Sequence, residues 1–313
     1  PDAIPYHTSY YKKNWGFCVT NRQYESLKDA NGPFEIFIDS NFNPNGSLTI
    51  GELLIPGKNE EEILISTYIC HPSLANDNLS GMLMTAFLAK ELMKNKNRKR
   101  GYRIIWVPET IGAISYCAMN ESEMKKIKSG LIITSVGGPG KYGYKKSFNS
   151  EHSVNAIIEQ VFNNDNIDYI TYPFDIHGSD ERQYCSPNIE LPVCSFLKSK
   201  NYPEYHTNLD NFDVVTRKGL EQSLDVFKSI IDTFETGLYP KSTVLGEPNL
   251  GKRGLYPTIS QKGTQRREIK KRMNLIAYSN GKNDLFKISN LTNISPRELC
   301  KEYMLLKSRK VLR

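Results

Sequence analysis

Short apolar runs alternate along the chain with segments of helical period, and this alternation restricts the fold more than any other feature. Four runs are rich in β-branched and aromatic residues, as strands buried on both faces of a parallel sheet are: residues 63–69, 102–107, 131–136 and 193–197. Apolar residues recur three and four positions apart over residues 79–95, 152–164 and 220–238. The pattern predicts an α/β layer fold with helices on both faces of the sheet.

A dispersed set of histidine and acidic residues indicates the chemistry of the chain. Its members come from four separate segments: His71, Asp77, Glu109, Asp180 and His206. Imidazole nitrogens and carboxylate oxygens are zinc ligands, and a glutamate not used in ligation is able to deprotonate a water molecule. His71 and Glu109 each follow a predicted strand by two residues, which is where ligands gather in open sheets of this kind. We therefore predict a metal-dependent hydrolase.

Each of these residues also has a simpler structural interpretation. Asp77 precedes a helix expected to open at Asn78 or the next residue, so that Asn78 caps free backbone N–H groups and the carboxylate of Asp77 gains from the helix dipole. In that interpretation His71 is a hydrogen-bonded loop histidine, Asp180 belongs to a solvated charge cluster or internal ion pair, and His206 stacks among aromatic residues. The occurrence of His71 and Asp77 together in HPSLANDN favours the metal site.

Composition indicates the class of protein. The chain has 313 residues, 39% of them hydrophobic and 24% charged, which is enough for one large core and a small second domain. No apolar run approaches the roughly 20 residues of a membrane helix, and the first residues lack the pattern of a signal peptide. The six cysteines have no C-x-x-C spacing, as expected for reduced, mostly buried thiols. We expect a cytoplasmic protein that does not bind membranes.

The charge is unevenly distributed and indicates a second module. Residues 241–313 contain 17 Lys and Arg against five Asp and Glu, a net charge of +12, whereas the whole chain carries +7 and residues 1–240 therefore −5. Residues 239–265 are rich in Gly, Pro and polar residues and have no clear period, which is typical of a linker. We place the boundary near Leu250.

The last residues have the order of a winged helix: a helix, a turn at Asn280-Gly281, a second helix, and a third helix capped by Ser295. The basic excess suits nucleic-acid phosphates, so a non-catalytic or nucleic-acid-binding regulatory protein is the alternative function. The basic residues are, however, spread over the linker and all three helices, without an evident set of base-reading side chains. A packing or dimerisation role is expected ahead of DNA binding, and dimerisation would make the protein a homo-oligomer.

Five strings, in this order, carry a resemblance to a known family. They are SYYKKNWGFC, ISTYICHPSLANDNLSG, WVPETIGAISY, GSDERQYCSP and YPEYHTNLD, and they span about residues 5–212. The chain resembles the zinc aminopeptidases of the M28 type, and more closely their bacterial aminopeptidase-like branch with a C-terminal winged helix. The resemblance implies a three-layer sandwich with a mixed, mostly parallel sheet, and an aminopeptidase that hydrolyses a peptide or small amide substrate.

The same resemblance implies roles for the candidate site residues. His71, Asp77 and Asp180 would hold one zinc ion. Asp77 would bridge to a second zinc ion, held also by His206, and Glu109 would be the general base.

The resemblance also implies a division into domains. A small β-rich domain is inserted before the His-containing strand in such relatives, and residues 1–57, with a hairpin-like segment at 34–57, would be the rest of it. Residues 58–250 would form the catalytic domain and residues 251–313 the winged helix. The first strands of the catalytic domain would then precede Pro1.

Two positions depart from the family pattern. The peptidases have a Glu-Glu pair, base and then ligand, where this chain has Glu109-Thr110, and Thr110 is a poor replacement for a carboxylate. A second ion would need Glu181, water or substrate to complete its ligands, so one or two zinc ions are expected. An Asp often follows the first His by two residues and orients it, whereas here that position is Ser73. Asp210 is a candidate for support on the other side of the site.

Overall fold

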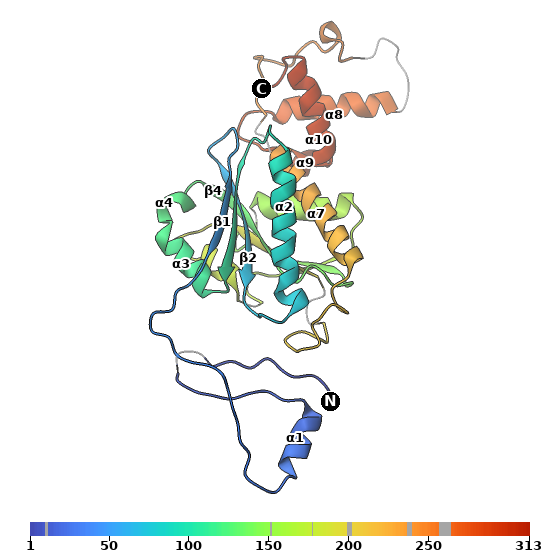
Figure 1. Ribbon diagram of the computed structural model, residues 1–313. Helices are drawn as coiled ribbons and strands as arrows, with labels where there is room; N and C mark the ends of the chain where they lie inside the picture. The colour runs from blue at the N-terminus through green and yellow to red at the C-terminus, as the bar shows by residue number, and fades with distance from the viewer. Residues whose placement is uncertain (10–11, 151, 177, 199–201, 237–239, 257–263) are drawn as a thin grey trace. The chain divides into compact units, whose positions relative to one another are not determined.

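The structure is a computed structural model of the chain, and it describes all residues except 10–11, 151, 177, 199–201, 237–239 and 257–263 (Figure 1). The chain divides into two compact units, Pro1–Asn149 with Asp168–Asp225, and Ser150–Ile167 with Val226–Arg313. The domain limits predicted at residues 57 and 250 stay predictions.

One seven-stranded sheet organises the first unit. Its strands lie in the order β1-β3-β2-β4-β7-β5-β6. Their bounds are Gly51–Ile55 (β1), Glu62–Ile69 (β2), Gly101–Pro108 (β3), Ile127–Ile133 (β4), Tyr142–Lys145 (β5), Tyr169–Tyr172 (β6) and Val193–Lys198 (β7). β1 is antiparallel to β3 and β5 is antiparallel to β7, whereas the other neighbours are parallel. The mixed, mostly parallel sheet expected from the sequence is confirmed.

The four runs predicted as strands are β2, β3, β4 and β7. Residues 63–68 of β2 are all buried, as the composition of a central strand predicts. β4 ends at Ile133 rather than at residue 136, because Ser135 has φ +50 and leaves the extended conformation. The short strands β5 and β6 were not predicted, and β1 was expected only as part of a hairpin at 34–57. β1 and β6 lie at the edges of the sheet, and β5 follows a glycine-rich stretch.

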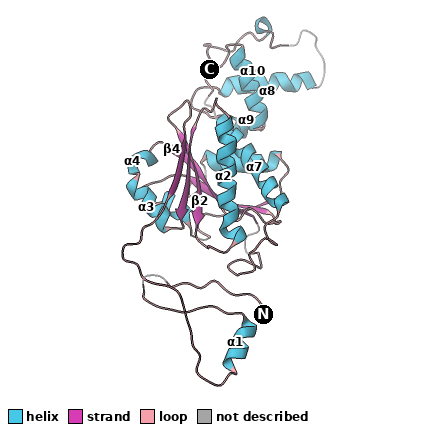
Figure 2. Cartoon of the chain, in the orientation of Figure 1, coloured by secondary structure: helices cyan, strands magenta, loops and turns pink. Residues whose placement is uncertain are grey.

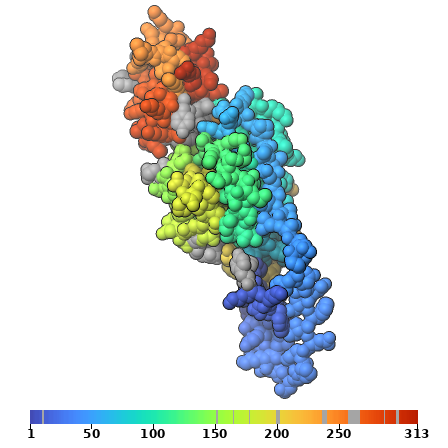
Figure 3. Space-filling view, turned by 90° about the vertical axis from the view of Figure 1, so that its left-hand side faces the viewer, coloured from blue at the N-terminus to red at the C-terminus, as the bar shows by residue number. Residues whose placement is uncertain are grey.

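Helices cover the sheet of the first unit, as Figure 2 shows with helices in cyan and strands in magenta. α2 (Gly81–Lys94) packs on β2 and lies in front of the strands in Figure 1. A separate apolar cluster joins the sheet to α3 (Ile111–Met119), α4 (Glu121–Met124) and α6 (Asp180–Tyr184). Its members include Leu64, Ile105, Ile132, Val193, Ala113, Tyr116 and Tyr184. In Figure 3 the green residues of α3 and α4 lie beside the blue edge of the sheet, which β1 forms.

The start of α2 agrees with the prediction in its position but not in its cap. A π-helical turn, η1 (Ala75–Ser80), precedes α2, and within it Asp77 and Asn78 have non-helical dihedral angles, so the helical backbone that leads into α2 opens at Leu79. The amide of Asn78 does not cap a helix: Nδ2 donates to Oγ1 of Thr67 at 2.8 Å and to the Tyr68 carbonyl at 3.0 Å. Its Oδ1 accepts from the Ser135 N–H at 3.0 Å. Asn78 is buried, so its side chain satisfies groups of β2 and of the segment after β4 instead.

Residues 1–50 also differ from the expectation. Their described part contains α1 (Asn21–Lys28) and an isolated bridge between Pro5 and Thr207, but no strand. The hairpin expected at 34–57 was wrong, because β1 pairs with β3, and Phe37 is 88% exposed. A two-stranded hairpin is marginal by itself, whereas pairing with a large sheet stabilises a strand.

The second unit contains α5 (Ser153–Asn164), the end of α7 (Arg217–Thr236), η2 (Gly251–Arg253), α8 (Thr264–Tyr278), α9 (Leu285–Thr292) and α10 (Pro296–Ser308). The predicted segments 152–164 and 220–238 are α5 and α7, although residues 237–238 lie outside the described part of the chain. No helix that the structure describes is long and apolar enough to span a bilayer.

α8, α9 and α10 surround one apolar cluster that includes Leu275, Leu285, Ile288, Leu299 and Leu306. Oγ of Ser295 accepts from the Glu298 N–H at 3.2 Å, so the predicted cap of the third helix is confirmed. Isolated bridges pair Lys241 with Asn280 and Ser242 with Leu312, beside the three helices. The predicted winged helix is confirmed.

Candidate metal site and adjoining cavity

Three of the predicted residues converge beyond the carboxyl end of β2: His71, Asp77 and His206. One ligand atom of each lies within 4.8 Å of the others. Nε2 of His71 is 3.5 Å from Oδ2 of Asp77, and Nε2 of His206 is 3.2 Å from the same oxygen. Ligands about 2.0–2.2 Å from a tetrahedral zinc ion are roughly 3.3–3.6 Å apart, so these spacings and donor types fit one shared ion. Three protein ligands leave a fourth position open, as in catalytic rather than structural sites.

Asp77 is held by residues on both sides. Asp210 accepts from the backbone N–H groups of Asn76 at 2.7 Å and Asp77 at 2.9 Å, and from the hydroxyl of Tyr202 at 2.6 Å. The hydroxyl of Tyr68 donates to Oδ1 of Asp77 at 3.0 Å. Oδ2 therefore remains as the oxygen that faces the histidines. Asp210 therefore supports the site through the backbone of Asn76 and Asp77 rather than on the side of His206, where its position in the sequence suggested support.

Aromatic rings enclose the two imidazoles. Tyr6 meets His71 edge-on with ring centroids 4.2 Å apart, and Tyr205 stacks on His206 at 3.9 Å. The stacking that the sequence offered as an alternative for His206 thus occurs together with its place in the cluster. Burial lowers the pKa of His71, although the Asp77 carboxylate opposes this, and a neutral imidazole is the form that binds a metal. Among the residues that the structure describes, Nδ1 of His71 is buried without a hydrogen-bond partner, as expected where Ser73 takes the place of an orienting Asp.

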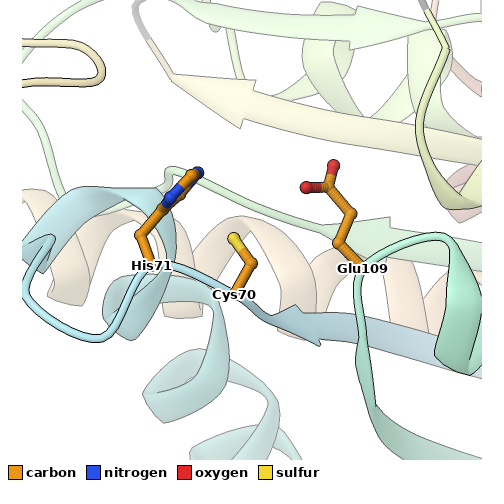
Figure 4. Close-up of side chains that lie close together, drawn as sticks. All are labelled: Cys70, His71 and Glu109. Carbon is orange, nitrogen blue, oxygen red and sulfur yellow. The ribbon is translucent and has the colours of Figure 1, made fainter. Parts of the chain in front are cut away.

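Glu109 lies next to this group. Ligand atoms of Glu109, Cys70 and His71 are within 4.8 Å of one another, and Figure 4 shows the three side chains around one space. Burial raises the pKa of Glu109, while the hydroxyl of Ser179, 2.6 Å from Oε1, acts in the opposite direction. Burial also raises the pKa of the Cys70 thiol, which keeps it protonated and weakly nucleophilic.

Asp180 is the one predicted ligand that the structure does not bring into the cluster. Among the described residues it belongs to neither group of candidate ligands. It is fully buried, and its Oδ1 accepts from the Thr110 N–H at 2.7 Å. Burial raises the pKa of Asp180 to about 7. The solvated charge cluster considered for this segment is therefore wrong for Asp180.

Glu181 has other partners as well. Its carboxylate forms an ion pair with Lys145, and it accepts from the Ser179 N–H and the Ser195 hydroxyl at 3.1 Å each. Thr110 has no carboxylate and Glu181 is engaged by Lys145, so among the described residues His71, Asp77 and His206 remain as a candidate ligand set for one ion.

A cavity of about 320 Å³ opens beside Glu109. Tyr68, Tyr172, Tyr202 and Tyr205 contribute aromatic walls, together with Ile132 and Leu197. Lys145, Glu181 and Ser195, each at most 5% exposed, add a polar patch to the lining. Such mostly apolar cavities with a few polar groups are typical of substrate sites.

Sequence reasoning missed this lining. Lys145 comes from β5, which was not predicted, so the internal ion pair considered for the segment of Glu181 had no partner assigned. Tyr205 directly precedes His206 in the sequence, so its proximity to the site was the one available signal.

Comparison with known proteins gives a consistent picture of the family. The model described as a domain of unknown function, DUF4910, matches residues 13–237, and a winged helix-turn-helix model matches residues 238–313. A Clostridium acetobutylicum protein named for polysaccharide biosynthesis and an aminopeptidase-like domain is 44% identical over 264 residues. The match covers 82% of this chain and 59% of that relative, so the chain spans well under two thirds of the length of the relative.

Solved structures agree with the fold. A candidate peptidase from Clostridium acetobutylicum matches with a TM-score of 0.88 and 37% identity, over 100% of this chain and 70% of that one. A glutaminyl cyclase from an Acidobacteriales bacterium matches with a TM-score of 0.52 and 15% identity, over 60% of this chain and 74% of the other. This likeness concerns the fold alone. Since the DUF4910 model covers most of its residues, the protein belongs to the DUF4910 family, with a winged helix at its C-terminus.

Proposed function

We propose that this protein is a zinc-dependent hydrolase of peptide or amide bonds, an aminopeptidase of the M28 type, with one ion held by His71, Asp77 and His206. The observation that carries the proposal is the spacing of 3.5 and 3.2 Å between the two imidazole nitrogens and one oxygen of Asp77. The aminopeptidase-like domain of the Clostridium acetobutylicum relative supports the same reaction class.

The proposed reaction divides the work between the ion and the side chains. A zinc ion at this site would polarise the amide carbonyl and lower the pKa of the attacking water from about 15.7 to about 7. Glu109 accepts the proton of that water as it attacks the carbonyl carbon. It then gives the proton to the leaving amine as the C–N bond breaks.

The surroundings of Glu109 support its role as base. Burial raises the pKa of its carboxyl group, and a base is most effective when its pKa lies near the working pH. The Ser179 hydroxyl donates a hydrogen bond to Oε1 of Glu109 and not to Oε2. Asp180 is left out of the proposed ligand set, because among the described residues it belongs to neither group of candidate ligands.

The cavity beside Glu109 supports a substrate with a bulky group next to the bond that is cleaved. Its volume of about 320 Å³ and its tyrosine walls suit an amino-acid side chain or a ring of similar size. The Lys145–Glu181 pair adds a cation and an anion to the lining, so polar substituents are also accommodated.

Metal stoichiometry, measured by elemental mass spectrometry on protein prepared without chelators, tests the proposal. The wild type should contain about one zinc ion per chain, and His206→Ala should lose it. His7→Ala is the matched control, because His7 is exposed and outside the cluster, and it should keep the ion. Glu109→Gln should keep the ion and lower amide hydrolysis by about 10²- to 10⁴-fold, the usual share of a general base.

Two results would oppose the proposal. Absence of any bound metal, even after reconstitution, would remove the hydrolase centre. Full turnover in Glu109→Gln, with the ion still bound, would remove the base.

A further inference from the structure

A tight reversal of the backbone follows Glu109. The Ile111 N–H donates to the Glu109 carbonyl at 2.7 Å, which closes a three-residue γ-turn with Thr110 at its centre. Thr110 has φ +62 and ψ −66. This conformation is rare and strained for any residue with a side chain, and more so for a β-branched one. Thr110 therefore needs support from outside the turn.

Two consecutive residues of a distant segment provide that support. The Thr110 N–H donates to Oδ1 of Asp180 at 2.7 Å. The hydroxyl of the preceding residue, Ser179, donates to Oε1 of Glu109 at 2.6 Å. Residues 179–180 thus contact both the carboxylate of Glu109 and the backbone that follows it.

The carboxylate of Asp180 has no other hydrogen bond in the described part of the chain. Its Oδ2 is buried without a partner, and the residue is fully buried. Burying a carboxylate with so few partners costs free energy. Costly features of this kind, together with strained backbone, are concentrated at functional sites. The hydrogen bond from the Thr110 N–H is therefore the contact through which the buried Asp180 carboxylate acts.

Loss of this bond has a direct consequence for Glu109. Without an acceptor for its N–H, Thr110 gains by relaxing to negative φ, where L-residues are unstrained. Rotation at residue 110 opens the γ-turn and shifts the preceding residue. We expect the Glu109 carboxylate, held then by the Ser179 hydroxyl alone, to move from the space that it shares with His71 and Cys70 (Figure 4).

We infer that Asp180 is a positioning residue: its bond to the Thr110 N–H holds the strained turn that keeps the Glu109 carboxylate beside the metal site. The inference rests on the proposed role of Glu109 as base. It replaces the ligand role that the family resemblance implies for Asp180.

Four variants test the inference: Asp180→Ala, Asp180→Asn, Thr110→Gly and the double variant Asp180→Ala/Thr110→Gly. Asp180→Ala should lower kcat by about 10- to 100-fold, as loss of a supporting residue does, with zinc content unchanged. Glycine adopts positive φ without strain, so Thr110→Gly should recover a large part of the kcat that Asp180→Ala loses. Asp180→Asn keeps an oxygen for the Thr110 N–H and should lose less than Asp180→Ala. Asp175→Ala, an exposed aspartate of the same segment, is the matched control.

Urea unfolding of the same variants separates this inference from the proposed reaction. The midpoint should fall in Asp180→Ala and rise again when Thr110→Gly is added, whether or not an amide substrate is hydrolysed. If Thr110→Gly restores neither the midpoint nor kcat of Asp180→Ala, the inference is wrong. Loss of zinc in Asp180→Asn would also overturn it, because that result identifies a ligand. Failure of the wild type to bind zinc or cleave amides would refute the proposed function and leave the midpoint test to decide on the turn.

Discussion

Replacing Asp210 tests how the protein holds its metal-binding carboxylate. Asp210 is fully buried, and it accepts two backbone N–H groups, of Asn76 at 2.7 Å and of Asp77 at 2.9 Å, in addition to the Tyr202 hydroxyl. These bonds fix the backbone from which the Asp77 side chain extends. We expect substitutions at Asp210 to lower both stability and metal affinity, although Asp210 does not contact the ion in the proposed site.

The hydrogen bonds give the size of the effect. Asp210→Ala leaves two buried N–H groups without an acceptor, at about 1–3 kcal/mol each, so the free energy of unfolding should fall by about 2–6 kcal/mol. Asp210→Asn keeps one carbonyl oxygen, and hence one of the two bonds, and should lose about 1–3 kcal/mol. Zinc affinity of the folded protein should fall by about 10- to 100-fold in Asp210→Asn.

Urea unfolding of the metal-free protein measures the first effect, and competition with a chromophoric zinc chelator measures the second. Asp213→Asn is the control, because Asp213 is an exposed aspartate of the same loop. The reasoning is refuted if Asp210→Asn and Asp213→Asn have the same stability and the same zinc affinity.

Four further predictions concern other parts of the molecule. Lys145→Met leaves the Glu181 carboxylate buried without its cation and should lower the free energy of unfolding by about 3–5 kcal/mol. Adding Glu181→Gln should recover most of that loss. If urea unfolding shows no recovery in the double variant, the pairing is contradicted. Burial raises the pKa of Asp180 to about 7 from 3.8, so folded metal-free protein retains a proton that the unfolded chain releases. Its contribution to the free energy of unfolding is complete below pH 3.8 and is lost as pH rises toward 7. Between these pH values, the free energy of unfolding measured in urea should fall less in Asp180→Asn than in the wild type, and equal falls would exclude this titration. Tyr6→Ala should weaken zinc binding because Tyr6 packs on His71, whereas Tyr6→Phe keeps the ring and should bind as the wild type does, as chelator competition would show. If the winged helix binds DNA, Lys301→Glu on the exposed face of α10 should reduce binding and its salt dependence; no binding by the wild type at low salt would remove the nucleic-acid alternative.

The centre of the fold was predictable because it depends on local patterns. The apolar runs of β2 and β3 are buried over most of their length, so their composition alone identifies them. β5 and β6 contain four residues each, and pairing with neighbours rather than composition makes them strands. The hairpin expected at 34–57 was also wrong because pairing decides the structure there: β1 pairs with β3.

The candidate site was predictable in its residue types but not in all of its contacts. His71, Asp77 and His206 converge as the α/β pattern and the family resemblance imply. The bond of Asp180 joins it to a backbone N–H 70 residues away, and no spacing rule indicates such a contact. The error at Asn78 has a similar origin, because its side chain satisfies buried groups of two strand ends rather than those of a helix.

The bridge between Pro5 and Thr207 has a consequence for the order in which the protein folds. The Tyr6 N–H donates to the His206 carbonyl at 2.8 Å, which joins residues from opposite ends of the first unit. Closing so long a loop costs entropy that only contacts already formed offset, so we expect the sheet to assemble before this pairing. Zinc capture would then be among the last events of folding, and a nascent chain would remain unable to bind the ion until residues beyond His206 had been synthesised.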